Sequence, residues 1–188
     1  MFKRLLILIL IACLSLLLTS TPTIAQGDPS RQMGAYLSTS YWDGCTLHCR
    51  PYVFLLLNGT KTINITPQGR TKTSVFDIDS YLGLNGGPYI RATGVQVGED
   101  ADQLAVSQDL GWAGLDFVGS LVGTDRLSYQ VVLHVSWWAT GSTIFENGLY
   151  KRAARVEGYF QYGDIVRQIP FTGVKAADAY IFSTQAPR

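Results

Sequence analysis

Short segments of strand-forming residues, separated by turn sequences, fill the chain from about residue 33 to its end. Val, Ile, Thr and aromatic residues dominate these segments, and Gly, Pro and Asn divide them. The predicted strands cover residues 33–42, 52–57, 60–65, 73–78, 89–97, 103–108, 115–121, 127–138, 149–161, 165–171 and 179–183. So many short strands predict an all-β fold: a single antiparallel β-sandwich of the jelly-roll or Greek-key type, or alternatively a closed β-barrel.

Two Asn-Gly pairs predict tight hairpins within this pattern. Asn58-Gly59 and Asn147-Gly148 both suit a type I′ turn, because both residue types tolerate the positive φ angles that it requires. After the second pair, residues 150–156 read "YKRAARV", in which two alanines favour a helix. We predict a strand there, because strand pairing commonly overrides so short a helical preference.

The first 25 residues have the three parts of a secretory signal peptide. Met1–Arg4 carries two positive charges, Leu5–Leu18 is almost entirely apolar, and Thr23-Ile24-Ala25 supplies small residues before a cut. The apolar run is about 14 residues long, whereas a spanning helix needs about 20. We therefore expect residues 1–25 to be removed, leaving one all-β domain over residues 26–188 that is secreted or periplasmic. A retained membrane anchor and lipidation at Cys13 are the alternatives.

The charge balance of the mature chain argues against nucleic acid as a partner. Without Lys3 and Arg4, 13 basic residues face 14 acidic ones, so no basic surface is indicated. We also expect no stable membrane span in the mature chain and no cofactor. A glycan or another component of the cell envelope is the partner that we expect.

Cys45 and Cys49 lie in the sequence "YWDGCTLHCRPY". In an exported protein such a pair predicts a disulfide, which would stabilise a local turn and not the whole fold. A metal site completed by His48 and His134 is the alternative, but the spacing matches no usual zinc pattern. We therefore predict no metal.

Two other patterns would matter only in particular settings. Asn58-Gly59-Thr60 and Asn64-Ile65-Thr66 match the N-glycosylation pattern, which applies if the source is a eukaryote. Four acidic residues gather between Gly98 and Gly114, which suggests either a calcium loop or a solvated loop. The calcium interpretation lacks the spacing of an EF-hand loop.

Trp137 and Trp138 are adjacent in a predicted strand, so they point to opposite faces. The positions in phase with Trp137 are apolar, whereas those in phase with Trp138 include His134 and Ser136, so Trp137 is predicted to face the core. If Asn147-Gly148 joins this strand to the next, Trp137 lies over Gly158. The same register places Trp138 opposite Glu157, Ser136 opposite Tyr159 and His134 opposite Gln161.

An outward face with both aromatic and hydrogen-bonding groups follows from this pattern. A sugar-binding platform needs that combination, since an aromatic ring covers the apolar side of a pyranose while polar groups bind its hydroxyls. Alternatively, Trp138 is covered by a loop or by Arg155 and serves packing alone. The candidate ligand-binding residues are His134, Ser136, Trp138, Arg155, Glu157 and Tyr159, with Gln168 nearby.

The sequence contains no recognisable catalytic motif, so we predict no catalytic residue and a non-catalytic exported domain that acts by binding or surface association, with carbohydrate as the most concrete ligand. A small secreted hydrolase using Asp77, Asp79 or His134 is one alternative, because paired carboxylates on one strand face can act as acid and base. A barrel that carries an apolar ligand in its interior is another.

Overall fold

The computed structural model describes residues 30–41, 53–66, 69–81, 89–98, 102–171 and 177–188. This part of the chain contains eleven strands and no helix, which confirms the predicted all-β class. The strands are β1 (Arg31–Tyr41), β2 (Val53–Thr66), β3 (Gly69–Tyr81), β4 (Tyr89–Gly98), β5 (Leu104–Val106), β6 (Trp112–Val122), β7 (Ser128–Ala139), β8 (Ile144–Glu146), β9 (Leu149–Tyr162), β10 (Ile165–Ile169) and β11 (Asp178–Ser183).

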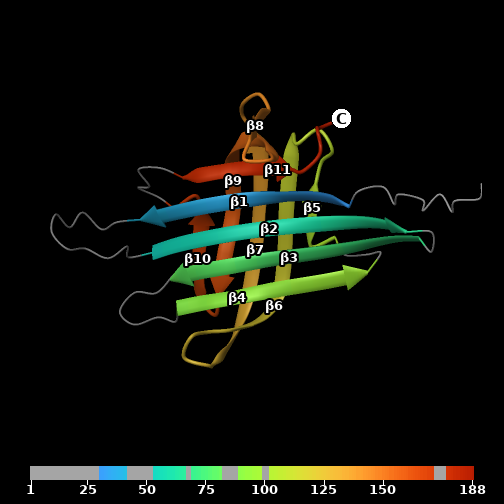
Figure 1. The fold of residues 1–188 in the computed structure, drawn as a ribbon. Helices are drawn as coiled ribbons and strands as arrows, with labels where there is room; N and C mark the ends of the chain where they lie inside the picture. The colour runs from blue at the N-terminus through green and yellow to red at the C-terminus, as the bar shows by residue number, and fades with distance from the viewer. Residues whose placement is uncertain (1–29, 42–52, 67–68, 82–88, 99–101, 172–176) are drawn as a thin grey trace, which may run out of the picture.

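The strands form one curled antiparallel sheet in the order β4-β3-β2-β1-β11-β9-β7-β6-β5, with β8 and β10 also paired to β9. The sheet folds back on itself, so β11 and β1–β4 lie in front of β5–β7 and cross them (Figure 1). We call β1–β4 with β11 the first layer, and β5–β7 with β10 the second layer.

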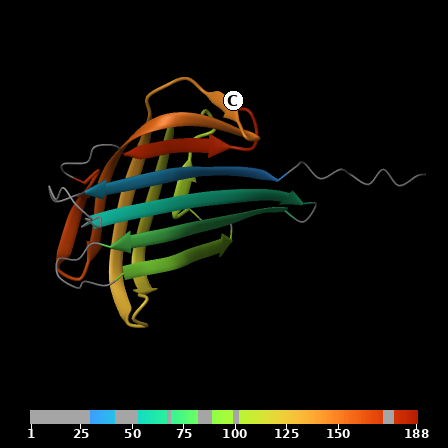
Figure 2. The ribbon, with the colours of Figure 1, turned by 60° about the vertical axis from the view of Figure 1, so that its left-hand side comes forward.

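Strand β9 belongs to both layers. Its residues 150–153 pair with β11, and its residues 154–162 pair with β7. The strand arches from one layer into the other (Figure 2). At the far side, an isolated bridge between Ile90 and Gly123 joins the end strand of the first layer to the end of β6.

The core lies between the layers and results from the period-two alternation of apolar residues. In β7 the residues Val131, Leu133, Val135 and Trp137 are all buried, as the alternation predicts. The largest fully buried side chains are those of Trp137, Phe76 and Phe160, from three different strands. A barrel that carries an apolar ligand would need a cavity between the layers. These side chains occupy that space.

The predicted hairpin at Asn58-Gly59 is wrong. Both residues lie in the middle of β2, where Asn58 is paired with Tyr36 of β1 and with Asp77 of β3. Strand partners on both sides outweigh a local turn preference. The predicted strands 52–57 and 60–65 are therefore one strand, and Asn58 is not at a hairpin tip.

The predicted turn at Asn147-Gly148 is confirmed, but it joins β8 to β9 and not β7 to β9. The two residues have φ angles of 52° and 79°, and Glu146 pairs with Leu149. The β7–β9 register consequently differs from the prediction by two residues. A shift of two keeps every side chain on its face, so only the partners change. Trp138 pairs with Arg155, Trp137 with Val156, Ser136 with Glu157 and His134 with Tyr159.

Gly158 has another role than the predicted one beneath Trp137. It pairs with Val135 and has a φ of +149°. A Cβ atom at Gly158 would lie 2.0 Å from the carbonyl oxygen of His134. Glycine is needed here because two backbones approach closely.

Several predictions concern residues outside the described ranges. These are the signal peptide over residues 1–25, lipidation at Cys13, the Cys45–Cys49 disulfide and a role for His48. Within the described ranges, no helix has the length and apolar character needed to cross a membrane. The same ranges contain no cluster of three or more His, Cys, Asp or Glu side chains that could hold a metal ion.

Candidate ligand-binding face

The outward side of the second layer and of β9 brings all six predicted ligand-binding residues onto neighbouring strands. Each is adjacent, along its own strand, to a buried residue that points into the core, because side chains alternate between the two faces of β7 and β9. Gln168 of β10 pairs with Tyr159 and extends the set, as predicted. We call this surface the tryptophan face, and it comprises Trp112, Asp116, His134, Ser136, Trp138, Arg155, Glu157, Tyr159 and Gln168.

Trp138 is open to solvent and held by two neighbours. The side chain is 43% exposed, and its indole N–H donates to Oε1 of Glu157 over 3.1 Å. The ring of Trp112, on the adjacent strand β6, lies 6.3 Å from that of Trp138 at an interplanar angle of 57°. The expected outward position of Trp138 is thus confirmed, and its aromatic neighbour is a second tryptophan.

Trp112 bends over Gly114, the residue two positions along β6. A Cβ atom at Gly114 would lie 2.6 Å from Cζ2 of the Trp112 ring, so a larger residue would displace the indole. Gly114 pairs with Ser136, which places Ser136 beside the tryptophan pair in the sheet. The glycine therefore helps to set the position of Trp112.

His134 lies between a carboxylate and an aromatic ring. Its Nδ1 atom contacts Oδ1 of Asp116, its cross-strand partner on β6. On the other side it stacks on Tyr159, with ring centroids 5.8 Å apart and an interplanar angle of 30°. Both groups of the pair are accessible, since the side chains of His134 and Asp116 are 47% and 74% exposed.

The sequence-based reasoning missed Asp116 and Trp112. Both would follow from a correct β6–β7 hairpin, whose turn lies at residues 123–127. Gly123 and Asp125 are a turn signal there, and a turn centred on Asp125 places Asp116 opposite His134. The alternation of residues along each strand could be read from the sequence, whereas the pairing of β6 with β7 was not predicted.

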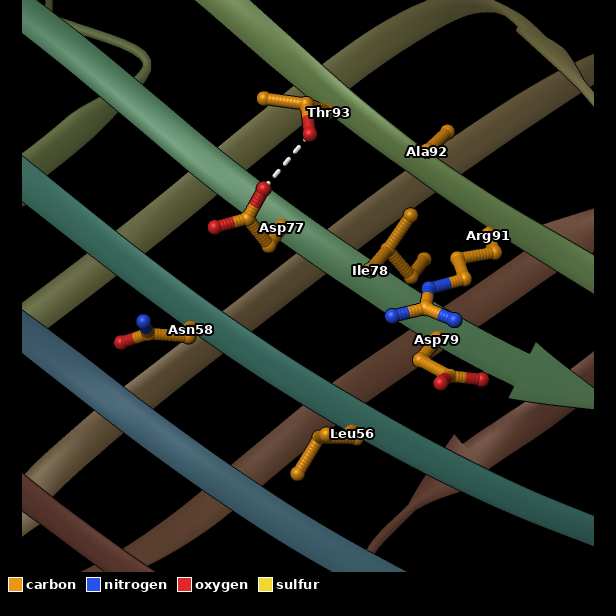
Figure 3. A pocket seen from close by; sticks show the side chains of 8 residues that line it. All are labelled: Leu56, Asn58, Asp77, Ile78, Asp79, Arg91, Ala92 and Thr93. Atoms are coloured by element: carbon orange, nitrogen blue, oxygen red, sulfur yellow. Dashed lines mark hydrogen bonds between the residues drawn. The ribbon is translucent and has the colours of Figure 1, made fainter.

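The three residues of the hydrolase alternative are not brought together. Asp77 and Asp79 project outward from β3 of the first layer, whereas His134 projects outward from β7 of the second layer. Asp77 accepts a hydrogen bond of 2.6 Å from the Thr93 hydroxyl. The two aspartates line a separate hollow of the first layer (Figure 3).

Two acidic residues of the segment between Gly98 and Gly114 have partners inside the chain. Asp102 lies 2.6 Å from Nζ of Lys61 and 3.2 Å from Nζ of Lys72. Asp109 accepts a hydrogen bond from the backbone N–H of Gly111 over 2.9 Å. These two carboxylates therefore serve local structure and ion pairing.

A comparison of the chain with protein-family models, curated proteins and solved structures finds no match.

Proposed function

We propose that the chain is an exported, non-catalytic domain that binds saccharide at the tryptophan face. In this proposal residues 1–25 are removed on export, Cys45 and Cys49 form a disulfide, and the curled sheet acts as a two-layered sandwich. The ligand is a glycan, or a cell-envelope component that presents one.

The observation that carries the proposal is the exposed and oriented indole of Trp138. A tryptophan of a soluble domain is generally buried for most of its surface, so one that is 43% exposed and fixed by Glu157 is a candidate contact for a ligand. The apolar side of a pyranose can pack on such a ring. Trp112 adds a second, tilted aromatic surface beside it.

Polar groups surround the indole at the distance of one strand spacing. Across the β7–β9 ladder, Arg155 pairs with Trp138 and Glu157 pairs with Ser136. Neighbouring strands lie about 4.8 Å apart, which is within the span of one sugar ring and its hydroxyls. His134 and Tyr159 supply further hydrogen-bonding groups two residues along the same face.

Intrinsic tryptophan fluorescence during titration with soluble oligosaccharides tests the proposal. We expect saturable changes with at least one saccharide, and a loss of about tenfold in affinity in Trp138→Ala, because an aromatic contact contributes about 0.5–1.5 kcal/mol beyond the apolar area that it buries, and about 1.4 kcal/mol corresponds to tenfold. Isothermal titration calorimetry on the same variants separates a loss of binding from a loss of signal. Phe145→Ala is the matched control, since Phe145 is an exposed aromatic residue on β8, away from the tryptophan face.

The proposal is wrong if a broad panel of neutral, acidic and amino sugars produces no response in the wild-type chain. It is also wrong if Trp138→Ala and Phe145→Ala have the same effect. Export and processing have their own test: the secreted chain should begin at Gln26, and its intact mass should reveal the disulfide through resistance to thiol alkylation before reduction.

A further inference from the structure

A hollow of about 470 Å³ lies on the outward side of the first layer, away from the tryptophan face. Strands β2, β3 and β4 contribute to it, and Figure 3 shows the side chains of its lining residues spread along these three neighbouring strands. Its volume falls within the range of small-molecule sites, about 300–1,000 Å³. We call it the charged hollow, and it is lined by Leu56, Asn58, Asp77, Ile78, Asp79, Arg91, Ala92 and Thr93.

Strand pairing explains why polar groups converge there. Asn58 lies opposite Asp77, which lies opposite Thr93, so the three form one row across the sheet. The next row runs from Leu56 through Asp79 to Arg91. Each row presents its side chains on the same face, and the hollow therefore combines carboxylate, amide and guanidinium groups.

Several of these groups have no hydrogen-bond or ion-pair partner in the part of the chain that the structure describes. Neither the Asn58 amide nor the Arg91 guanidinium has a hydrogen-bond or ion-pair partner among the described residues. The Asp79 carboxylate accepts a hydrogen bond from the Tyr89 hydroxyl, yet its buried Oδ1 atom has no partner in that part of the chain. The Asn58 amide and the Arg91 guanidinium, from the two strands that flank β3, are thus available around one hollow.

The mixture of donors and acceptors selects the kind of ligand. A cation would be bound by the carboxylates and repelled by Arg91, while an anion would be bound by Arg91 and repelled by the two aspartates. A hydroxyl both donates and accepts, so adjacent hydroxyls can serve an amide, a carboxylate and a guanidinium together. The apolar side chain of Leu56 offers a contact for the carbon skeleton.

We propose that the charged hollow is a second saccharide site, which binds a neutral sugar through its hydroxyl groups. Asn58 and Asp77 are the principal contacts, and Arg91 donates from the opposite side. The choice of ligand class rests on the function proposed for the tryptophan face, but the residues and the layer are different. A chain with two sites on opposite sides can bind two glycan segments at once, which increases avidity for a polymer.

Backbone amide chemical shifts of the full mature chain, recorded during titration with neutral oligosaccharides, test this inference. We expect two groups of shifted amides, one in β6, β7 and β9 and one in β2, β3 and β4. Asn58→Ala should weaken binding at the second group by about tenfold and leave the first unchanged. Asn64→Ala is the matched control: Asn64 is the same residue type on the same face of the same strand, outside the hollow.

The two sites give separate signals, so each proposal can fail alone. Shifts confined to β6, β7 and β9, or a second group that Asn58→Ala leaves unchanged, would overturn the inference and leave the tryptophan face intact. Shifts confined to β2–β4 and weakened by Asn58→Ala would support the inference and overturn the function proposed for the tryptophan face. A preference of the hollow for a carboxylated sugar over its neutral analogue would also overturn the inference.

Discussion

The indole N–H of Trp137 donates to the backbone carbonyl of Tyr36, with 2.9 Å between the two atoms. Trp137 belongs to β7 of the second layer and Tyr36 to β1 of the first, so this hydrogen bond crosses the core. The fully buried indole therefore combines a large apolar contact with a satisfied polar group, as a buried tryptophan requires.

Replacement of Trp137 by Ala should lower the free energy of unfolding by about 3–5 kcal/mol, because it leaves a cavity and removes this hydrogen bond. Urea denaturation followed by far-ultraviolet circular dichroism measures this change. Trp138→Ala is the matched control and should cost less than about 1 kcal/mol, since Trp138 is exposed. Equal losses in the two variants would contradict the assignment of Trp137 to the core.

Glu157 should tune binding through the orientation of Trp138. In Glu157→Ala the indole N–H loses its acceptor, and we expect the affinity for a saccharide to fall by about three- to tenfold. Glu157→Gln retains an acceptor oxygen and should bind nearly as well as the wild-type chain. Fluorescence titration compares the two variants, and a loss as large in Gln as in Ala would indicate that the charge, and not the orientation, is what the ligand needs.

Gly158→Ala should destabilise the chain by at least about 2 kcal/mol, because the new Cβ atom meets the His134 carbonyl and the backbone has a positive φ. Thermal unfolding measures the effect. Gly141→Ala is the control, because a Cβ atom there would have no other residue within 4 Å apart from its two neighbours in the chain. A Gly158→Ala variant as stable as Gly141→Ala would show that the β7–β9 backbone approach is not as close as described.

Stability in acid should depend on Asp102. Its hydrogen bond with Lys61, and then that with Lys72, hold the pKa of Asp102 below its ordinary value of 3.8. A carboxylate with a lowered folded pKa stabilises the fold above pH 3.8, and this contribution is lost as the pH falls through the folded pKa. Asp102→Asn should therefore be less stable than the wild-type chain at pH 6, and the difference should shrink toward pH 3.

Thermal unfolding at a series of pH values measures the Asp102 effect. Asp164→Asn, at an exposed turn after β9, is the matched control, because Asp164 forms no ion pair among the described residues. An Asp102→Asn difference that is the same at pH 6 and pH 3 would mean that the two lysines do not stabilise the carboxylate.

The sequence pattern was sufficient to predict the faces of strands but not their partners. The alternation in β7 correctly assigned Trp137 to the interior and Trp138 to the surface, because burial of one face is a local property of each strand. The six residues of the predicted ligand face share a surface for the same reason. Their exact partners were wrong by two residues, because Asn147-Gly148 joins β9 to the short strand β8.

What could not be predicted depended on contacts between distant strands. Asn58-Gly59 has a strong local turn preference, but β1 and β3 flank it and hold it in an extended strand. The pairing of β6 with β7 is what places Asp116 and Trp112 on the tryptophan face. The charged hollow requires three strands in register, and the sequence pointed to Asp77 and Asp79 as a carboxylate pair and to Asn58 as a turn residue, but not to one site that contains all three.

The pairing of β1 with β11 makes completion of the fold depend on the whole chain. Met33 lies opposite Ser183, so the first strand of the sheet acquires one of its two neighbours from the last. Contacts between such distant residues form slowly, because a long loop must close before they contribute. A chain that lacks residues 178–183 would leave one edge of β1 and the first half of β9 exposed, and such edges promote association with other chains. Translation or translocation that stops short of the last strand should therefore produce an aggregation-prone product and not a smaller functional domain.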